Sequence, residues 1–297
     1  LSGIFHSPLS DTAEPITVYS SSRGQRRLAY LSRLYPNSSS YNVAASLYFR
    51  GVLDVSKLEY ALNASAMRHE SAFTYLAKSD GDDISIVDYN IPITLPIKDL
   101  ENIKNAESIA DEIRKDIATT VFDLSKPPLW RMTLLRHNDH YHELVVSIHH
   151  YISDGWSLVN TLRDIAFIYE GGDASDLKAV NGFKHFAQYE RMREAQPSFT
   201  QAQAFWSDKL QHCDPVIDIL PGRKRPHVFD DTGQRINYSV PPSLGATLRK
   251  VAANNQVTIA SLLNCVFSVL LFQRSQSSKF ALGIAYSDRP EMELEDI

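Results

Sequence analysis

The chain has little of what a disulfide-rich, metal-binding or nucleic-acid-binding protein needs. Its 297 residues include 2 cysteines, Cys213 and Cys265, which form no C-x-x-C pair and are too few for a metal site. Such sparse cysteine fits a reducing compartment, so we expect a cytoplasmic protein. Positive charge is not in excess, because 30 Lys and Arg stand against 35 Asp and Glu. A net charge of -5, with the single basic cluster at 223–225, argues against a nucleic-acid partner.

Long hydrophobic runs are also missing. The most apolar segment, 259–272, is interrupted by polar residues and is shorter than the ~20 residues of a membrane span. It predicts a buried helix, and we expect no membrane partner. The N-terminus shows neither Met nor a charged region followed by an apolar run, so no secretion signal is visible. The chain starts at Leu1 and stops at Ile297 after a charged stretch, which indicates a piece of a longer protein.

Several catalytic motifs are absent from the sequence. It contains no G-x-S-x-G elbow of a serine hydrolase and no glycine-rich phosphate loop. What remains is an ordinary globular composition, 43% hydrophobic and 22% charged, in a chain long enough for one large domain or two medium ones.

Hydrophobic periodicity predicts alternating strands and helices. Strands are expected at 41–49, 84–87, 129–136, 141–149 and 281–286, and helices at 25–34, 55–66, 106–117, 158–169, 183–193, 201–210, 244–253 and 258–273. This alternation favours a layered α/β architecture. A Gly-, Asp- and Ser-rich segment at 171–181 suggests a domain boundary. We therefore expect a linker at 1–20, one subdomain at 21–175 and a second at 176–297.

The informative segment lies where the strand 141–149 should end and a helix should begin. It reads His149-His150-Tyr151-Ile152-Ser153-Asp154-Gly155-Trp156-Ser157. A histidine at such a junction can take a proton at neutral pH, since its ordinary pKa is near 6.5. Asp154 can orient a ring, hold the loop through a cation or cap the helix. Gly155 lets the backbone approach a substrate oxygen, toward which its N–H can point.

Structural explanations compete with this catalytic one. A single histidine at a strand end is more often a packing residue than a base. For the whole H-H-x-x-x-D-G sequence at a strand-to-helix turn, the catalytic explanation is preferred. A metal site is disfavoured, because His149 and His150 should point to opposite faces of a strand and cannot easily share one ion.

The segment resembles the signature of condensation domains from nonribosomal peptide synthetases, which belong to the chloramphenicol-acetyltransferase-like superfamily. Other segments resemble the same family along most of the chain. They are the opening Ser22-Arg23-Gly24-Gln25-Arg26-Arg27-Leu28, Tyr41-Asn42-Val43, Arg68-His69-Glu70, Phe122-Asp123-Leu124 with Pro128-Leu129, Phe205-Trp206 with the loop 221–226, and 283–289 followed by Glu293-Leu294-Glu295.

The resemblance implies a fold and an activity. The fold is two acetyltransferase-like subdomains in a V-shaped pseudo-dimer with a tunnel between them, the second subdomain being incomplete here. A donor acyl or peptidyl thioester and an acceptor aminoacyl thioester would arrive on the phosphopantetheine arms of two carrier proteins, and an amide would form. Adenylation domains would be neighbours, and the domain itself would bind no cofactor and no metal.

The resemblance also implies roles for individual residues. His150 would act as the base or as the positioner of the amine, with Asp154 and Gly155 completing the catalytic segment. Asp154 would pair with Arg289, and His149 would support the loop. Ser153, Trp156 and Arg68 would be supporting residues.

Two alternatives share the same motif. An epimerisation domain of the same fold moves the α-proton of a carrier-bound residue and also carries H-H-x-x-x-D-G. An inactive domain that only binds carrier proteins is the other. Ser157 after Trp156, and Phe205-Trp206 with the loop that follows, favour condensation.

Overall fold

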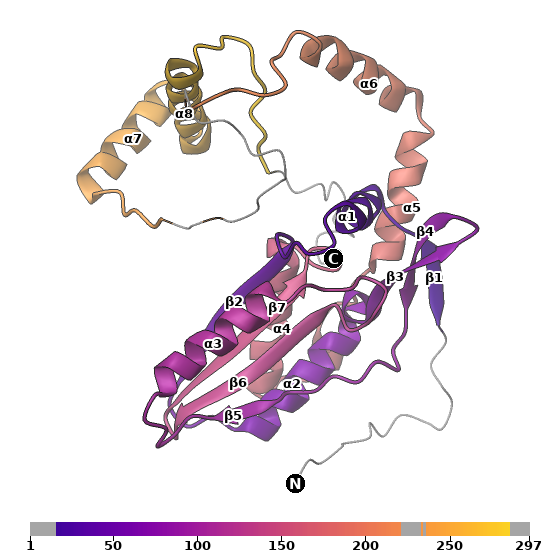
Figure 1. Cartoon of the computed structure of the whole chain (residues 1–297), viewed down its shortest axis with the longest axis vertical. Helices are drawn as coiled ribbons and strands as arrows, with labels where there is room; N and C mark the ends of the chain where they lie inside the picture. The colour runs from indigo at the N-terminus through magenta and orange to yellow at the C-terminus, as the bar shows by residue number, and fades with distance from the viewer. Residues whose placement is uncertain (1–15, 221–232, 234–235, 286–297) are drawn as a thin grey trace. The chain divides into compact units, whose positions relative to one another are not determined.

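A computed structural model describes residues 16–220, 233 and 236–285 of the chain (Figure 1). The described residues form two compact units, one ending at Arg193 and the other beginning at Glu194. The subdomain boundary that we place between residues 175 and 176 stays a prediction. The helix after it, α5 (Phe183–Glu194), lies almost wholly in the first unit, where its Ala187 is buried beside Phe73 and Val87.

The first unit contains two β-sheets. The smaller is antiparallel, with the strand order β1-β4-β3, and comprises β1 (Thr17–Ser20), β3 (Thr74–Ser79) and β4 (Asp82–Val87). The larger has the order β2-β7-β6-β5 and comprises β2 (Asn42–Arg50), β5 (Ile97–Asp99), β6 (Trp130–Asn138) and β7 (Tyr141–His149). Its β5–β6 pair is parallel, whereas its other pairs are antiparallel.

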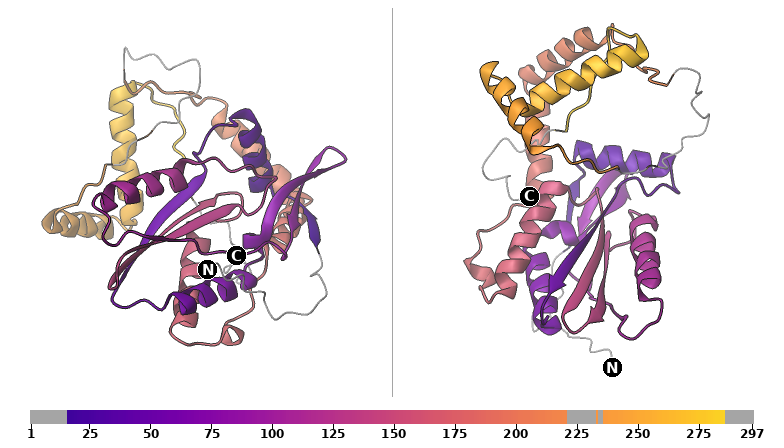
Figure 2. Two further views of the ribbon diagram at one scale, coloured as in Figure 1. Left: turned by 60° about the horizontal axis from the view of Figure 1, so that its bottom comes forward. Right: turned by 90° about the vertical axis from the view of Figure 1, so that its left-hand side faces the viewer.

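Helices cover both faces of the larger sheet (Figure 2). On one face α3 (Ala106–Thr119) packs on Leu135 and Val145. On the other, α2 (Val55–Arg68) and α4 (Gly155–Tyr169) pack on Leu134 and Leu144. Neighbouring residues of a strand point to opposite faces, so each adjacent pair, 134–135 and 144–145, contributes to two different cores. The strand expected at 141–149 is confirmed, and both of its faces are covered.

Capping residues in the sequence set where two of the helices begin. Asp54 accepts a hydrogen bond from the backbone N–H of Lys57 and starts α2, in the region where a helix was expected. At α1 (Arg23–Leu34) the Ser22 hydroxyl accepts from Gln25 N, and the Gln25 side chain accepts from Ser22 N. This reciprocal capping box has the S-x-x-Q spacing of the opening motif.

The structure also contains elements that the sequence did not predict. β1 lies inside the expected linker 1–20, where the β-branched and aromatic residues Thr17, Val18 and Tyr19 favour a strand. Strands β3 and β5 were missed, and short 3-10 helices follow α2 and α4, at η1 (Glu70–Phe73) and η2 (Ala174–Asp176). Of these unpredicted elements, only β1 and β3 affect the site described below. They belong to the smaller sheet, which packs against the chain segment that follows β7.

In the second unit, the described elements are three helices and an isolated bridge between Asp214 and Phe280. The helices are α6 (Pro197–Leu210), α7 (Pro242–Asn254) and α8 (Ile259–Ser275). Two predictions here are wrong. The segment 281–285 forms no strand as far as it is described. Helix α8 was expected to be buried, yet none of its residues is, because the described residues of this unit include no sheet to cover it.

No single helix among the described residues is both long and apolar enough to cross a bilayer. Helices α7 and α8, which meet at a bend of 100°, would satisfy the length and composition criteria only if counted together.

Candidate active site

The connection from β7 to α4 holds most of the residues predicted to form the site. β7 ends at His149 and α4 begins at Gly155, so five residues link a central strand to a helix that covers the same sheet. Backbone hydrogen bonds hold the start of this connection. His149 N donates to Leu129 O at 2.9 Å, and His150 N donates to Tyr41 O at 2.9 Å. The strand end is therefore fixed on both sides, by the segments that precede β6 and β2.

His150 is the first residue beyond β7, and its side chain is exposed. Within the part of the chain that the structure describes, no hydrogen bond or ion pair reaches its imidazole ring. The ring is thus available to a substrate, while its backbone is held by the bond to Tyr41. This combination suits a residue that exchanges or directs a proton.

His149 has the opposite environment. It is 6% exposed and lies between the rings of Tyr41 and Phe122, with centroids 6.4 and 6.0 Å away. Burial lowers the pKa of His149 to about 4, with a smaller contribution from the neighbouring His150. Its Nδ1 accepts a hydrogen bond from the backbone N–H of Tyr151 at 3.0 Å. His149 is therefore neutral at pH 7, and its ring stabilises the turn by accepting the bond from Tyr151.

Asp154 is the N-cap of α4. Its Oδ1 accepts from Trp156 N at 3.0 Å, from Ser157 N at 2.8 Å and from the Ser157 hydroxyl at 2.9 Å. In return, Asp154 N donates to the Ser157 hydroxyl at 3.5 Å, which completes a capping box. The carboxylate also suits the positive end of the helix dipole. The carboxylate therefore fixes the position of the first turn of α4.

The neighbours of Asp154 differ in exposure. Gly155 is exposed, and a Cβ added there would meet nothing within 4 Å. Trp156 is 51% exposed. Ser153 is half-buried, and its hydroxyl donates to Asp154 O at 3.3 Å. The residue type at Gly155 is thus not imposed by packing within the described chain, which leaves the space beside it open to a ligand.

Arg68 lies at the end of α2 and not on the connection. Its Nε donates to Asp164 Oδ2 of α4 at 2.9 Å, and its terminal nitrogens donate to Leu177 O and Lys178 O. His69 Nε2 lies 2.9 Å from the same Asp164 oxygen. Bonds to Arg68 and His69 outweigh burial and lower the pKa of Asp164. Arg68 and His69 therefore anchor α4 in the first unit, and no described contact joins them to His150.

Some predicted residues lie outside the described part of the chain. These are Arg289, the loop 221–226, the segment 286–289 and Glu293-Leu294-Glu295. The pairing of Arg289 with Asp154 stays a prediction. Phe205 and Trp206 are described, and they lie exposed on α6 with ring centroids 5.3 Å apart.

Sequence reasoning missed Tyr151. Its side chain is fully buried, and its hydroxyl contacts Ser85 and Ser21. Gln25 also reaches the connection, since its Nε2 donates to Tyr151 O at 3.4 Å. Gln25 could have been found from the sequence, because it belongs to the opening motif. Tyr151 could not, because nothing in the sequence indicates that it pairs with two distant serines.

The metal prediction concerns an absence. Among the described residues no group of three or more His, Cys, Asp or Glu side chains could hold an ion. In the second unit, a cavity of about 720 Å³ is lined by Asp208, His212 and both cysteines, together with Lys209, Lys279 and apolar residues of α8. Its potential ligands do not form such a group among the described residues.

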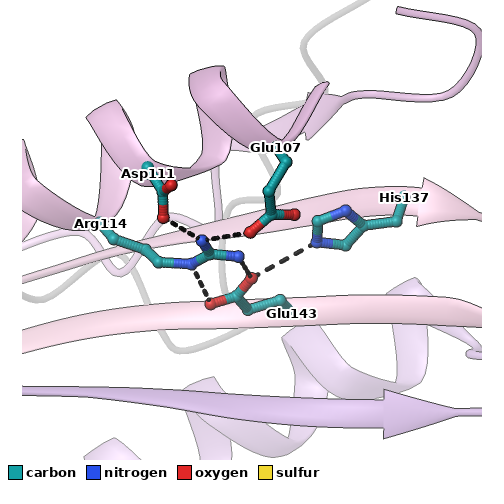
Figure 3. A network of polar contacts seen from close by, with 5 residues as sticks. All are labelled: Glu107, Asp111, Arg114, His137 and Glu143. Atoms are coloured by element: carbon teal, nitrogen blue, oxygen red, sulfur yellow. Dashed lines mark hydrogen bonds and ion pairs between the residues drawn. The ribbon is translucent and has the colours of Figure 1, made fainter. Parts of the chain in front are cut away.

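A separate polar network lies at the other end of β7 (Figure 3). Arg114 of α3 donates to both carboxylate oxygens of Glu143, at 2.9 and 2.7 Å, and Glu143 is fully buried. Glu107 and Asp111 bind the third nitrogen of the guanidinium group, and His137 Nε2 lies 3.4 Å from Glu143. Despite burial, these bonds lower the pKa of Glu143. At about 3.3 Å per residue, Glu143 lies ~20 Å along the strand from His149.

Solved structures identify the fold. The condensation domain of the monacolin K polyketide synthase superposes with a TM-score of 0.77 at 18% identity, over 94% of this chain and 65% of that one. The first condensation domain of the calcium-dependent antibiotic synthetase, in complex with a substrate analogue, gives 0.73 at 18% identity over 88% and 62%. The mixed α/β fold is therefore the chloramphenicol-acetyltransferase-like fold of condensation domains, as predicted.

The sequence comparison identifies the family. The Condensation domain family matches residues 16–297, and the chain belongs to it. Bacitracin synthase 2 of Bacillus licheniformis is 27% identical over 95% of this chain and 10% of its own length. Surfactin synthase subunit 2 of Bacillus subtilis (strain 168) is 28% identical over 94% of this chain and 8% of its own. The chain thus spans about a tenth or less of these curated relatives, and it is a condensation domain of the nonribosomal peptide synthetase type.

Proposed function

We propose that this domain forms an amide bond between a donor acyl or peptidyl thioester and the amine of an acceptor aminoacyl thioester. The observation that carries this proposal is the position of His150. It is exposed at the end of a buried strand, its backbone is bonded to Tyr41, and its ring has no partner among the described residues. Membership of the Condensation domain family supports the same reaction.

Amide formation from a thioester requires few catalytic groups. A thioester is already activated, and an α-amine has a pKa near 8, so at neutral pH part of the acceptor must lose a proton before it attacks. His150 can accept that proton or orient the amine. Gly155 is the first residue of α4, where N–H groups have no partner within the helix. Asp154 accepts hydrogen bonds from the N–H groups of Trp156 and Ser157. Within the described structure, the Gly155 N–H is therefore available to bind a substrate oxygen.

The proposal includes partners. Both substrates would arrive on the phosphopantetheine arms of donor and acceptor carrier proteins, and adenylation domains would load those carriers. The relatives named above are synthases of which the matched region makes up only 10% and 8%, which supports a multidomain setting. We propose that the domain needs no metal or cofactor of its own and works in the cytoplasm.

The test uses the full-length protein with donor and acceptor loaded on their carriers. His150→Ala should lower amide formation by roughly 100- to 10,000-fold, the usual contribution of one acid–base group. The matched control is His140→Ala, because His140 is also exposed but lies in the turn before β7. It should leave the rate unchanged, and both variants should melt like the parent protein.

The same experiment separates the alternatives. An epimerisation domain would invert the α-carbon of a carrier-bound residue without forming an amide, which chiral analysis of the released amino acid detects. A non-catalytic domain would bind loaded carriers and yield neither product. Either result, or full activity of His150→Ala, would refute amide formation by His150.

A further inference from the structure

Three buried hydroxyl groups form a closed ring beneath the β7–α4 connection. The Tyr151 hydroxyl lies 2.8 Å from Ser85 Oγ and 3.1 Å from Ser21 Oγ, and the two serine oxygens lie 2.9 Å apart. All three residues are at most 1% exposed. Because each hydroxyl can donate one hydrogen bond and accept another, the ring satisfies all three groups without water.

The ring connects segments that are far apart in the sequence. Ser21 follows β1, Ser85 lies in β4 and Tyr151 follows His150. Gln25 of α1 lies beside the ring, since its Oε1 is 3.4 Å from Ser85 Oγ, and its Nε2 donates to Tyr19 at 3.3 Å. Burial raises the pKa of Tyr151, so its hydroxyl keeps its proton at neutral pH. The smaller sheet and α1 are thereby bonded to the connection that carries the site.

Tyr151 is held at three points. Its N–H donates to His149 Nδ1, its carbonyl accepts from Gln25, and its hydroxyl belongs to the ring. The neighbouring His150 has only the backbone bond to Tyr41 among the described contacts. The direction in which the His150 side chain leaves the backbone is therefore set by the residues on either side of it.

We propose that Tyr151 is a positioning residue for the reaction, and that the Ser21–Ser85–Tyr151 ring fixes the geometry of His150. The kinetic part of this proposal rests on the proposed function. A reacting group that moves by about 1 Å can lose ~100-fold in rate, even when the cause lies outside the site. The ring gives the catalytic segment a rigid support that a purely apolar side chain could not provide.

The first test is Tyr151→Phe in the full-length protein, which removes the hydroxyl and keeps the aromatic ring. We expect kcat for amide formation to fall by roughly 10- to 100-fold while KM for both loaded carriers stays the same. The matched control is Tyr169→Phe, because the Tyr169 hydroxyl is also hydrogen-bonded, to Asp54 N at 3.1 Å, but lies at the end of α4 far from the connection. It should keep the parent kcat. Equal losses in the two variants would overturn the proposal.

The second test does not depend on activity. In protein labelled with ¹³C and ¹⁵N at histidine, the ring signal of His150 is assigned by its loss in His150→Ala. We expect one sharp signal in the parent protein and a broadened or split one in Tyr151→Phe. An unchanged signal would overturn positioning through His150, even if kcat fell. If the parent forms no amide, the proposed function fails while this signal still decides the positioning role.

A second variant tests the proposal even if Tyr151→Phe does not fold. Ser85→Ala removes the nearer partner of the phenol and leaves Tyr151 in place, so it should produce the same changes in kcat and in the His150 signal. In the double variant the two effects should not add, because both changes break one ring. Additive effects, or a normal His150 signal in Ser85→Ala, would contradict the proposal.

Discussion

The backbone N–H of Tyr151 donates to Nδ1 of His149 at 3.0 Å, within the turn that follows β7. An accepting Nδ1 carries no proton, so the neutral ring of His149 is protonated at Nε2. Charging the ring would place a proton on Nδ1 and break this bond, in a side chain that is only 6% exposed. The fold therefore requires His149 to stay neutral.

A stability difference with pH follows from this requirement. His149 titrates near pH 6.5 when the chain is unfolded and near pH 4 when it is folded, so between these values the unfolded state binds more protons. The free energy of unfolding should fall as pH drops from 6.5 to 4, by up to about 3 kcal/mol from this residue. Urea unfolding at pH 7 and pH 5 measures the change.

The matched variant for this measurement is His149→Asn. Asparagine offers an oxygen to the Tyr151 N–H but does not titrate. Its unfolding free energy should therefore depend less on pH than that of the parent over this interval. A parent and a variant with the same slope would show that His149 is not the group responsible.

Asp154 gives the second prediction, which separates helix capping from pairing with Arg289. Asparagine caps a helix about as well as aspartate, so Asp154→Asn removes the charge and keeps the cap. If Arg289 pairs with Asp154, this variant should lose about 3 to 5 kcal/mol of unfolding free energy, and it should lose activity too. Denaturant unfolding and amide formation are measured on the same samples.

Asp154→Ala and Arg289→Gln complete this comparison. The pairing predicts that Arg289→Gln resembles Asp154→Asn and that their effects do not add. The alanine variant should be worse by about 1 kcal/mol, since it also loses the cap. A stable, active Asp154→Asn beside a mildly destabilised Asp154→Ala would show that capping is the only role of Asp154.

Gly155 supplies a third prediction. A Cβ at this position meets no protein atom within 4 Å, so Gly155→Ala should keep the melting temperature of the parent. Amide formation should nevertheless fall by roughly tenfold or more, because the added methyl group lies beside the proposed path of the substrate. Gly182→Ala is the contrasting variant, since its Cβ would collide with the Glu70 carboxyl group and should destabilise the fold. Full activity of Gly155→Ala would mean that no substrate passes this point.

The helices were predictable because their apolar residues repeat with a helical period, and β7 was predictable because consecutive apolar residues are typical of a strand covered on both faces. Asp54 marks the start of α2, and the 144–145 pair is buried on both faces of the sheet. Strand β5 was missed because its three residues are all exposed and carry no alternation. The buried helix expected at 259–272 is wrong in the described structure, since periodicity shows an apolar face but not what covers it.

The site was predictable in part for a similar reason. A period of two places His149 and His150 on opposite faces, but the sequence does not show that Tyr41 and Phe122 pack around His149 and bury it. The exposed side chain is that of His150, on which the sequence placed the reaction. Tyr151 was missed because its partners, Ser21 and Ser85, lie 130 and 66 residues away in the chain.

The fourth prediction concerns the buried ion pair of Arg114 and Glu143 (Figure 3). Glu143→Gln keeps the shape of the side chain but leaves the guanidinium group facing an amide at a fully buried position. Breaking a buried pair in this way should cost about 3 to 5 kcal/mol of unfolding free energy. Glu107→Gln and Asp111→Asn are matched controls on the same arginine, because both carboxylates are 70% exposed. Each should cost less than about 1 kcal/mol.

The pH dependence of stability provides a second test of the Arg114–Glu143 pair. The pKa of Glu143 is lowered in the folded chain by Arg114, Ser46 and His137, so its contribution is complete above its ordinary value and is lost as pH falls below it. The parent protein should therefore lose stability below pH ~4.5 more steeply than Glu143→Gln. Amide formation at pH 7 should be equal in both proteins below their melting temperatures, because the pair lies ~20 Å along β7 from His149. Equal costs for Glu143→Gln and Glu107→Gln would show that burial does not strengthen this pair.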